Sequence, residues 1–225
     1  MKLLRATAVI ILTLVLMPFG IPLSAQEDDT SPWSAGADLV TSFVWRGTRL
    51  GSGPHIQPVL EYSKGCFTAG AWGSFDLHDY EEVDLYFAFD FPCGFSIGMQ
   101  DYYLPGLEYF DFSPADGSHA FEVNAAYESD RVYLSANYIV NEAGGVGSSG
   151  SDLYFEGGMS FEYFTVFIGA GSGWHTVNGS FNVCNLGLVV PGEIEITDRF
   201  SIPVTANLIF NPDSEKLYIV ATFSF

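Results

Sequence analysis

Apolar residues alternate with other residues over stretches of about ten positions, and this period-two pattern recurs along most of the chain. In residues 82–91 one parity is apolar and the other is mostly polar: Val83, Leu85, Phe87, Phe89 and Phe91 are interleaved with Glu82, Asp84, Tyr86, Ala88 and Asp90. Successive side chains of a β-strand point to opposite faces, so the pattern predicts strands with one apolar face. The 24 Gly, 20 Phe and 12 Tyr residues also favour β structure with many tight turns.

These segments predict about twelve strands, and the connections between them alternate in length. Further alternating segments lie at residues 39–45, 67–77, 121–127, 132–138, 153–161, 200–210 and 217–225. Short connections are expected near residues 63–66, 92–94, 128–131, 162–164 and 197–199, and mostly longer ones near 46–54, 78–81, 104–118, 141–151, 172–179 and 211–216. Tilted strands of this length cross a hydrocarbon layer, where all backbone groups must pair in a closed ring. We therefore predict an all-β fold, a transmembrane antiparallel up-and-down β-barrel, over residues 33–225.

The segment before the barrel has the features of an export signal. Lys2 and Arg5 precede an apolar run over residues 6–17, and Leu23-Ser24-Ala25 ends it with small residues. We predict a cleaved signal peptide over residues 1–25 and a short periplasmic segment over residues 26–32. Outer-membrane barrels have short periplasmic turns and longer extracellular loops, so an even number of strands places both termini in the periplasm. The expected location is the outer membrane of a Gram-negative bacterium, in contact with its lipid.

The charge balance separates the membrane barrel from other classes. The chain has 27 acidic and eight basic residues, a formal net charge of −19, which argues against nucleic acid as a partner. An exported soluble β-sandwich or lipocalin-like barrel would also alternate, with its apolar face inward. Its water-facing parity should mix both charge signs, whereas here that parity is acidic with Arg46 as the one clear base.

Residues 43–74 carry a pattern that resembles a known family. Phe43-Val44-Trp45-Arg46-Gly47 is followed by Pro54 and Gln57, and then by Gly70-Ala71-Trp72-Gly73-Ser74. The sequence resembles the TorF-like porins, a group of outer-membrane β-barrels, over residues 35–77 and again over 198–225. It departs from them after Gly47, where Thr48-Arg49-Leu50-Gly51 replaces a Ser/Gln-rich run. The resemblance implies a porin barrel and little about its solute. In addition, the last strand ends in Phe225, like the signal that barrel-assembly machinery reads.

If the polar parity faces the lumen, carboxylates concentrate in a confined and poorly screened space that attracts cations. Two carboxylates about 6 Å apart repel by roughly 2.8 kcal/mol at an effective dielectric of about 20, so some should be protonated, pair with Arg46 or bind metal ions. Inward aromatic rings fill the interior or stack on sugars and organic cations. The residues expected to line the lumen and set its selectivity are Arg46, Gln57, Glu61, Trp72, Asp76, Asp84, Tyr86, Glu122, Tyr154 and Glu156.

The histidines and Arg46 are expected at the extracellular ends of strands. Arg46 has lumen parity there, so an ion pair with an acid could fix the width of the mouth. We interpret the histidines as solvated loop residues, with a metal-binding rim as the alternative, although no ligand spacing supports one. They are His55, His78, His119 and His175.

Three cysteines are an odd number for an oxidising compartment. Folding the chain about residues 79–80 brings Cys66 and Cys93 to the same periplasmic end of paired strands, which predicts a disulfide between them. Their parity differs by one residue, so the turn must be irregular, and the alternative is two unrelated thiols. Cys184 is expected to stay free and face lipid.

The sequence contains no convincing catalytic constellation. The run Gly169-Ala170-Gly171-Ser172-Gly173 is glycine-rich like a phosphate loop, but no helix pattern follows it. No histidine has a serine partner on the apolar face. We therefore expect no catalytic residue, metal or cofactor. The first hypothesis is a narrow passive channel for small solutes that prefers cations. The second is an occluded structural or ligand-binding barrel that acts through its extracellular loops, and the third is an enzyme.

Overall fold

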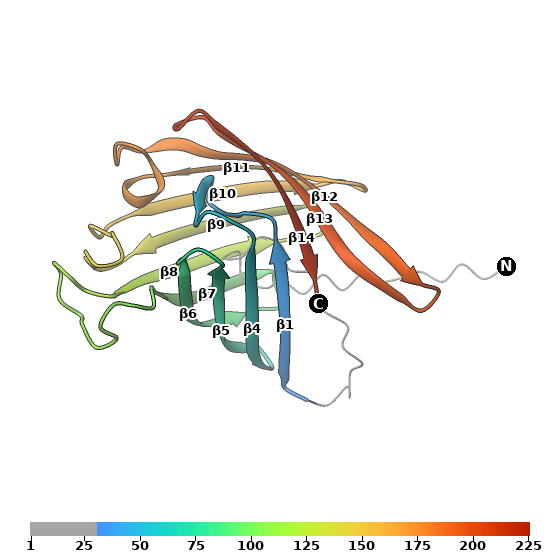
Figure 1. Cartoon of the computed structure of the whole chain (residues 1–225), viewed down its shortest axis with the longest axis horizontal. Helices are drawn as coiled ribbons and strands as arrows, with labels where there is room; N and C mark the ends of the chain where they lie inside the picture. The colour runs from blue at the N-terminus through green and yellow to red at the C-terminus, as the bar shows by residue number, and fades with distance from the viewer. Residues whose placement is uncertain (1–30) are drawn as a thin grey trace.

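The protein is a closed antiparallel β-barrel (Figure 1), seen in a computed structural model that describes residues 31–225. Twelve strands form the ring, and β1 closes it against β14. They are β1 (Trp33–Val40), β4 (His55–Lys64), β5 (Phe67–Asp76), β6 (Glu81–Asp90), β7 (Phe95–Tyr103), β8 (His119–Glu128), β9 (Val132–Ile139), β10 (Leu153–Ser160), β11 (Thr165–Gly171), β12 (Asn182–Thr197), β13 (Phe200–Asn211) and β14 (Lys216–Ser224). The predicted all-β barrel is thus confirmed.

Some predictions concern residues that the structure does not describe. The signal peptide over residues 1–25 lies outside the described range, as do residues 26–30 of the expected N-terminal segment. Within residues 31–225, no helix combines the length and the apolar character needed to cross a bilayer.

The outer surface of the barrel is apolar and its interior is polar. In β6, Phe87 and Phe89 are exposed on the outside at 41% and 39%, whereas Glu82, Asp84 and Tyr86 are buried on the other face. The same division holds in β7, β8 and β9, where the polar parity is the buried one. A soluble lipocalin-like barrel requires the opposite orientation, so the structure excludes that alternative.

The two ends of the barrel differ in their connections. The short turns at residues 65–66, 91–94, 129–131, 161–164 and 198–199 lie at one end, and the long connections at residues 41–54, 104–118, 140–152 and 172–181 lie at the other, together with two four-residue turns at 77–80 and 212–215. We call them the short-turn end and the long-connection end. Strand β1 begins at the short-turn end, because Trp33 pairs with Tyr62 just before the turn at residues 65–66, and β14 runs toward that end, with Phe223 opposite Val204 of β13. The predicted alternation of connection lengths therefore holds for four of the six connections at the long-connection end, and the turns at residues 77–80 and 212–215 are as short as those at the other end.

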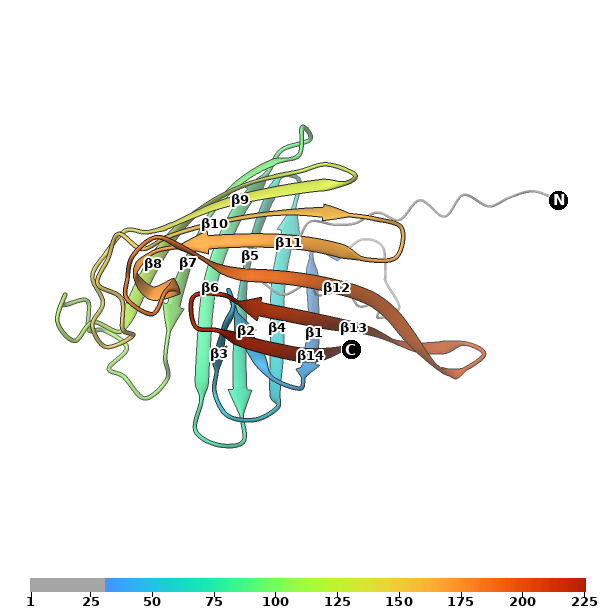
Figure 2. The same cartoon turned by 90° about the horizontal axis from the view of Figure 1, so that it is seen from above.

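Strands β12 and β13 extend beyond the rest of the ring (Figures 1 and 2). Pairing of β12 with β11 stops at Val189, and pairing of β13 with β14 stops at Val204. Residues 191–200 are all exposed. The outer parity of this extension remains apolar, since it carries Ile194 and Ile196.

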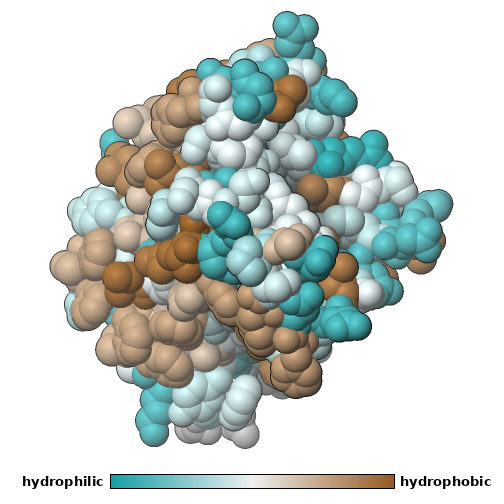
Figure 3. Space-filling model, turned by 90° about the vertical axis from the view of Figure 1, so that its left-hand side faces the viewer, coloured by the Kyte–Doolittle hydropathy of each residue, from teal (hydrophilic) through white to brown (hydrophobic). Residues whose placement is uncertain are grey.

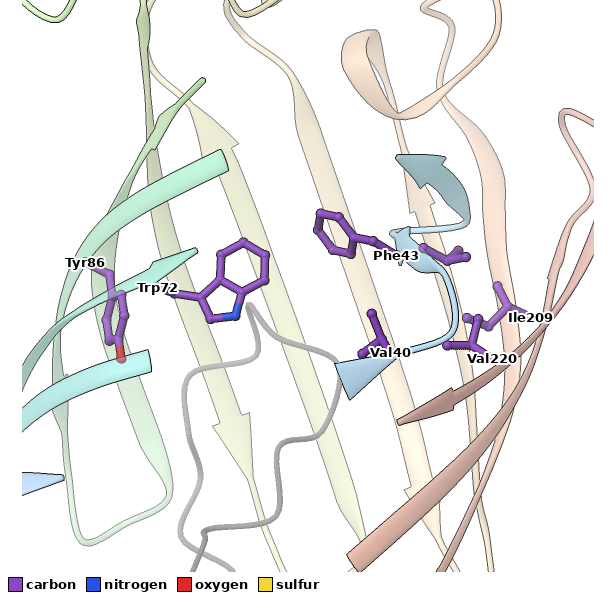
Figure 4. Packing of buried hydrophobic residues seen from close by; sticks show 7 residues of the cluster. Val40, Phe43, Trp72, Tyr86, Ile209 and Val220 are labelled. Atoms are coloured by element: carbon purple, nitrogen blue, oxygen red, sulfur yellow. The ribbon is translucent and has the colours of Figure 1, made fainter. Parts of the chain in front are cut away.

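A short hairpin lies inside the barrel and was not predicted. The sequence pattern placed residues 39–45 in one outward-facing strand, but β1 ends at Val40 and the chain turns inward at residues 41–42. Strands β2 (Phe43–Trp45) and β3 (Thr48–Leu50) then pair only with each other. Phe43 is consequently 2% exposed among buried residues of β5, β6, β13 and β14 (Figure 4). A bend in the chain can change which face a residue occupies without changing the alternation of the sequence. The alternation alone therefore does not reveal the bend at residues 41–42.

Candidate functional site

The tip of the β2–β3 hairpin is clamped to the opposite side of the barrel by an ion pair. Arg46 adopts a left-handed backbone conformation (φ 48°) at the turn. Its Nη1 and Nη2 atoms donate to Oε2 and Oε1 of Glu122 at 2.6 and 2.8 Å. Arg46 is 8% exposed and Glu122 is fully buried. Two parallel, charge-assisted hydrogen bonds fix the position of the tip as well as its charge.

Aromatic rings and a histidine complete the environment of Arg46. Its guanidinium lies 4.7 Å from the ring centre of Trp45 and 4.5 Å from that of Tyr154. Burial alone would lower the pKa of Arg46, but the Glu122 carboxylate raises it, and the net pKa is above its ordinary value. Burial and the charge of Arg46 together lower the pKa of His175 well below 6.5. The site therefore holds a charged arginine beside a neutral imidazole.

The hairpin reaches across the lumen. Gly47 (φ 83°) approaches β12 so closely that an added Cβ would lie 2.0 Å from the backbone oxygen of Cys184. The side-chain amide of Asn211 in β13 donates to the backbone oxygen of Gly47 at 3.0 Å. Only glycine permits both this conformation and this approach. Because the hairpin is connected to β1 and β4 and bonded to β8 and β13, it spans the interior.

Buried apolar side chains pack on both sides of the hairpin. Phe43 and Val44 belong to the cluster shown in Figure 4, together with Trp72 and Tyr86. Trp45 packs against a second buried cluster, which contains Tyr102 and Ile139, and its ring meets Trp174 edge-on at 5.6 Å. Trp174 belongs to a single 3-10 turn, η1 (Gly173–His175), in the connection between β11 and β12. Figure 3 views the long-connection end, where residues of both polarities cover the surface.

Inward tyrosines donate hydrogen bonds to inward carboxylates throughout the barrel. Tyr86 donates to Glu61 at 2.9 Å, Tyr102 to Glu122 at 3.0 Å, Tyr80 to Glu82 at 2.8 Å, and both Tyr133 and Tyr154 to Glu156. Sequence reasoning placed tyrosines and acids on one face but did not pair them. The spacing of two residues in Tyr80/Glu82 and Tyr154/Glu156 was the available signal, whereas the cross-strand pairs depend on register.

Four half-buried carboxylates line the interior on the short-turn side of the hairpin. They are Glu61, Asp90, Glu128 and Glu156. Among residues 31–225, none of the four forms an ion pair with a lysine or arginine. We call them the vestibule carboxylates.

The predicted site residues all lie on the inner face, but only some of them meet. Arg46, Glu122 and Tyr154 come together at the hairpin tip, and Glu156 joins them through Tyr154. Trp72 and Tyr86 instead pack in the apolar cluster beside the hairpin. The others make contacts of their own: Gln57 bonds Ser74, Asp84 bonds Gln100, Asp76 accepts from backbone amides of residues 52, 78 and 80, and Glu61 bonds Tyr86.

The interpretation of the histidines as solvated was wrong for three of the four. His55, His119 and His175 are almost fully buried, and His78 alone is exposed. The long connections fold back over the strand ends, so that the ring of Phe112 stacks on His119 while Asp101 bonds its Nδ1 at 2.9 Å. Within the described residues, no three His, Cys, Asp or Glu side chains are grouped as metal ligands.

The predicted disulfide is not formed in the structure, and all three cysteines are free. Register explains this, because Cys66 lies opposite Asp90, whose backbone nitrogen donates to its carbonyl at 2.8 Å. Cys93 lies three residues further along, in the next turn. Cys184 is free as expected but buried, not lipid-facing. The irregular register between β11 and β12 lies beside it and shifts its parity.

Comparisons with known proteins give distant structural matches only. No protein family matches the sequence, and no curated protein does so. Solved structures with a similar fold include engineered variants of Rhodopseudomonas blastica porin. One has 14% identity and a TM-score of 0.42 over 76% of this chain and 55% of that chain; another has 13% identity and a TM-score of 0.42 over 82% and 62%. The chain therefore spans a little over half the length of these porins.

Proposed function

We propose that the protein is a porin-like channel of the outer membrane that passes small solutes through a lumen narrowed by the β2–β3 hairpin. The observation that carries this proposal is the closed ring itself, with apolar side chains outside and acid-rich polar side chains inside. The apolar exterior can contact lipid acyl chains, and the polar interior can hold water and hydrated solutes. An inward-folded connection limits the size of solute that can pass.

Cation preference is the second part of the proposal. The charge of Arg46 is cancelled by Glu122, and the vestibule carboxylates have no basic partners among the described residues. A confined space with one sign of fixed charge concentrates ions of the opposite sign. Small cations should therefore enter more readily than anions.

The remaining parts of the proposal concern placement. We infer that the short-turn end faces the periplasm, where both termini would then lie, and that Phe225 is read by the barrel-assembly machinery. Membership of the TorF-like porins is part of the same proposal. We expect a passive, non-enzymatic protein because the sequence contains no convincing catalytic constellation.

A planar bilayer with a salt gradient tests the channel and its selectivity together. We expect stepwise currents whose reversal potential indicates cations. Replacing Glu61, Glu128 and Glu156 by Gln should shift that potential toward zero, because Gln keeps the size and shape of the side chain and removes its charge. Replacing the exposed loop residue Asp116 by Asn is the matched control and should change nothing. A current that prefers anions would contradict the proposal.

A second candidate is an occluded barrel that acts through its long connections. The complete burial of Glu122 inside the lumen and the tight approach of Gly47 to β12 favour it. A folded barrel that stays silent in the bilayer, while a variant with a detached hairpin conducts, would support this candidate over the first.

A further inference from the structure

The hairpin formed by β12 and β13 projects past the neighbouring strands at the short-turn end (Figure 2). Strand β12 continues to Thr197, whereas its pairing with β11 stops at Val189. On the other side, β13 begins at Phe200 and pairs with β14 only from Val204. We call residues 190–203 the projecting hairpin. Both of its outer edges carry backbone groups without a strand partner among the described residues.

The β12 edge of the projecting hairpin is the more open of the two. Proline cannot donate a backbone hydrogen bond, so Pro203 interrupts the short free edge of β13, while Pro191 stands at the start of the free edge of β12. Residues 192–197 follow it without another proline. At about 3.3 Å per residue they form an edge of about 20 Å, which is the length of an ordinary strand. An open edge of this length is a template for pairing with another chain.

The two faces of this edge differ in their chemistry. Ile194 and Ile196 are 45% and 54% exposed on the face that continues the outer wall of the barrel. Glu193 and Glu195 alternate with them on the opposite face and are also exposed. Ser201 of β13 donates to Glu193 at 3.0 Å, and neither carboxylate forms an ion pair among the described residues. A complementary strand therefore has apolar side chains on one face and positive charge on the other.

A second copy of the chain does not match this edge. Two β12 edges that pair about a twofold axis run antiparallel, and matching their apolar faces fixes which residues lie opposite each other. Registers that overlap most of residues 192–197 then place Glu193 or Glu195 directly opposite a glutamate of the other copy. Like charges in this position destabilise a strand pair. Lipid does not match the edge either, because it offers no hydrogen bonds to the open backbone groups.

We propose that the β12 edge of the projecting hairpin binds an extended segment of a partner protein in which apolar residues alternate with lysine or arginine. The segment lies where β11 would continue if it were longer, beyond the turn at residues 161–164. Its backbone pairs with residues 192–197, its apolar side chains lie beside the two isoleucines, and its basic side chains lie beside the two glutamates. This binding is independent of conduction. With the short-turn end in the periplasm, the partner is a periplasmic protein.

Fluorescence anisotropy with a short labelled peptide that alternates Val and Lys tests this edge. The protein is the full-length folded barrel in a zwitterionic detergent, and empty micelles give the background. We expect saturable binding of one peptide per chain. The double variant Glu193→Gln/Glu195→Gln should weaken it about two- to tenfold, because exposed charge pairs across strands contribute modestly. The control Glu108→Gln/Asp116→Asn removes two exposed carboxylates at the long-connection end and should bind as the wild type does.

Two further measurements separate strand pairing from adsorption to an acidic barrel. The charge swap Glu193→Lys/Glu195→Lys should bind a Val/Glu peptide more tightly than the Val/Lys peptide. The Val/Lys peptide with methylated backbone nitrogens keeps its side chains but donates no hydrogen bonds, so it should bind the wild type at least about tenfold more weakly.

Three results overturn the proposal. The first is a wild-type barrel without saturable binding of the Val/Lys peptide. The second is binding that neither the charge swap nor methylation of the peptide changes, because the peptide would then adsorb without pairing. The third is a wild-type dimer that the peptide dissociates, because the edge would then belong to a second copy of the chain. A silent barrel that passes these tests supports the docking edge and refutes only the channel.

Discussion

Removing the charge of Glu122 should release the β2–β3 hairpin from the far wall of the barrel. The variant Glu122→Gln keeps the shape of the side chain but leaves the Arg46 guanidinium buried without a counter-ion. Only one of the two hydrogen bonds of the pair, at 2.6 and 2.8 Å, can still form, because the amide nitrogen of Gln is a donor and cannot accept from the guanidinium. Removing one partner of a buried ion pair costs about 3–5 kcal/mol. A cost of about 3 kcal/mol raises the population of the undocked hairpin on the order of 100-fold.

The barrel itself should remain folded in this variant, because β1 pairs directly with β4. Among the described strands, β2 and β3 pair only with each other, so the backbone pairing of the ring does not depend on them. The assay is single-channel conductance, with heat-modifiable gel mobility as the check on folding. We expect a larger or more frequent open level than in the wild type. Asp116→Asn in the connection between β7 and β8 is the control, since Asp116 is exposed and forms no ion pair among the described residues.

A double variant separates the ion pair from other causes. Replacing both Arg46 and Glu122 by Met removes the charges together, which is commonly neutral or stabilising in a buried site. The hairpin should then stay docked and the conductance should return toward that of the wild type. A folded Glu122→Gln barrel with unchanged conductance would refute the reasoning, because the clamp would then not hold the constriction.

Four further predictions concern the hairpin, its pH response, the outer face and the thiols. Gly47→Ala should raise conductance in the bilayer, because the added Cβ would lie 2.0 Å from the oxygen of Cys184; a wild-type current would show that the tip does not dock there. Burial and Arg46 lower the pKa of His175 in the folded protein, so its contribution to stability is complete above pH 6.5 and is lost as the pH falls below it. Thermal unfolding should therefore show less acid destabilisation in His175→Asn than in the wild type, and identical pH profiles would contradict this. Phe87→Lys should destabilise the barrel in lipid vesicles by about 2–4 kcal/mol in urea titrations if this face lies at the centre of the bilayer, whereas no loss would mean that it does not contact acyl chains. Thiol titration without reductant should find two reactive cysteines before denaturation and three after it, because Cys184 is buried. Detection of only one thiol after denaturation would show that Cys66 and Cys93 form the disulfide predicted from the sequence.

Periodicity predicted the wall of the barrel because it reports on a property of each strand alone. The alternation of Leu85, Phe87 and Phe89 with Glu82, Asp84 and Tyr86 depends only on which face of β6 meets which surroundings. The lengths of the connections were equally visible. These local signals were sufficient for the strand number, the orientation and the distinction between the two ends.

Contacts across the lumen could not be predicted in the same way. The pairing of Arg46 with Glu122 joins residues 76 positions apart, and it depends on the inward turn at residues 41–42. Apolar residues keep alternating through Phe43 and Trp45, as they would if β1 extended that far. The alternation alone therefore could not reveal the hairpin. Burial of His119 has a similar origin, because the connection over residues 104–118 folds back upon it.

The hairpin connects β1 to β4, and these two strands pair with each other from Trp33 opposite Tyr62 to Val40 opposite His55. Sequence change within residues 41–54 is thereby uncoupled from the integrity of the cylinder. Variation there can resize or reseal the passage without disturbing how the chain assembles in a bilayer. Exchange of this one segment for a two-residue turn would leave the ring of twelve strands unchanged and remove the hairpin from its interior.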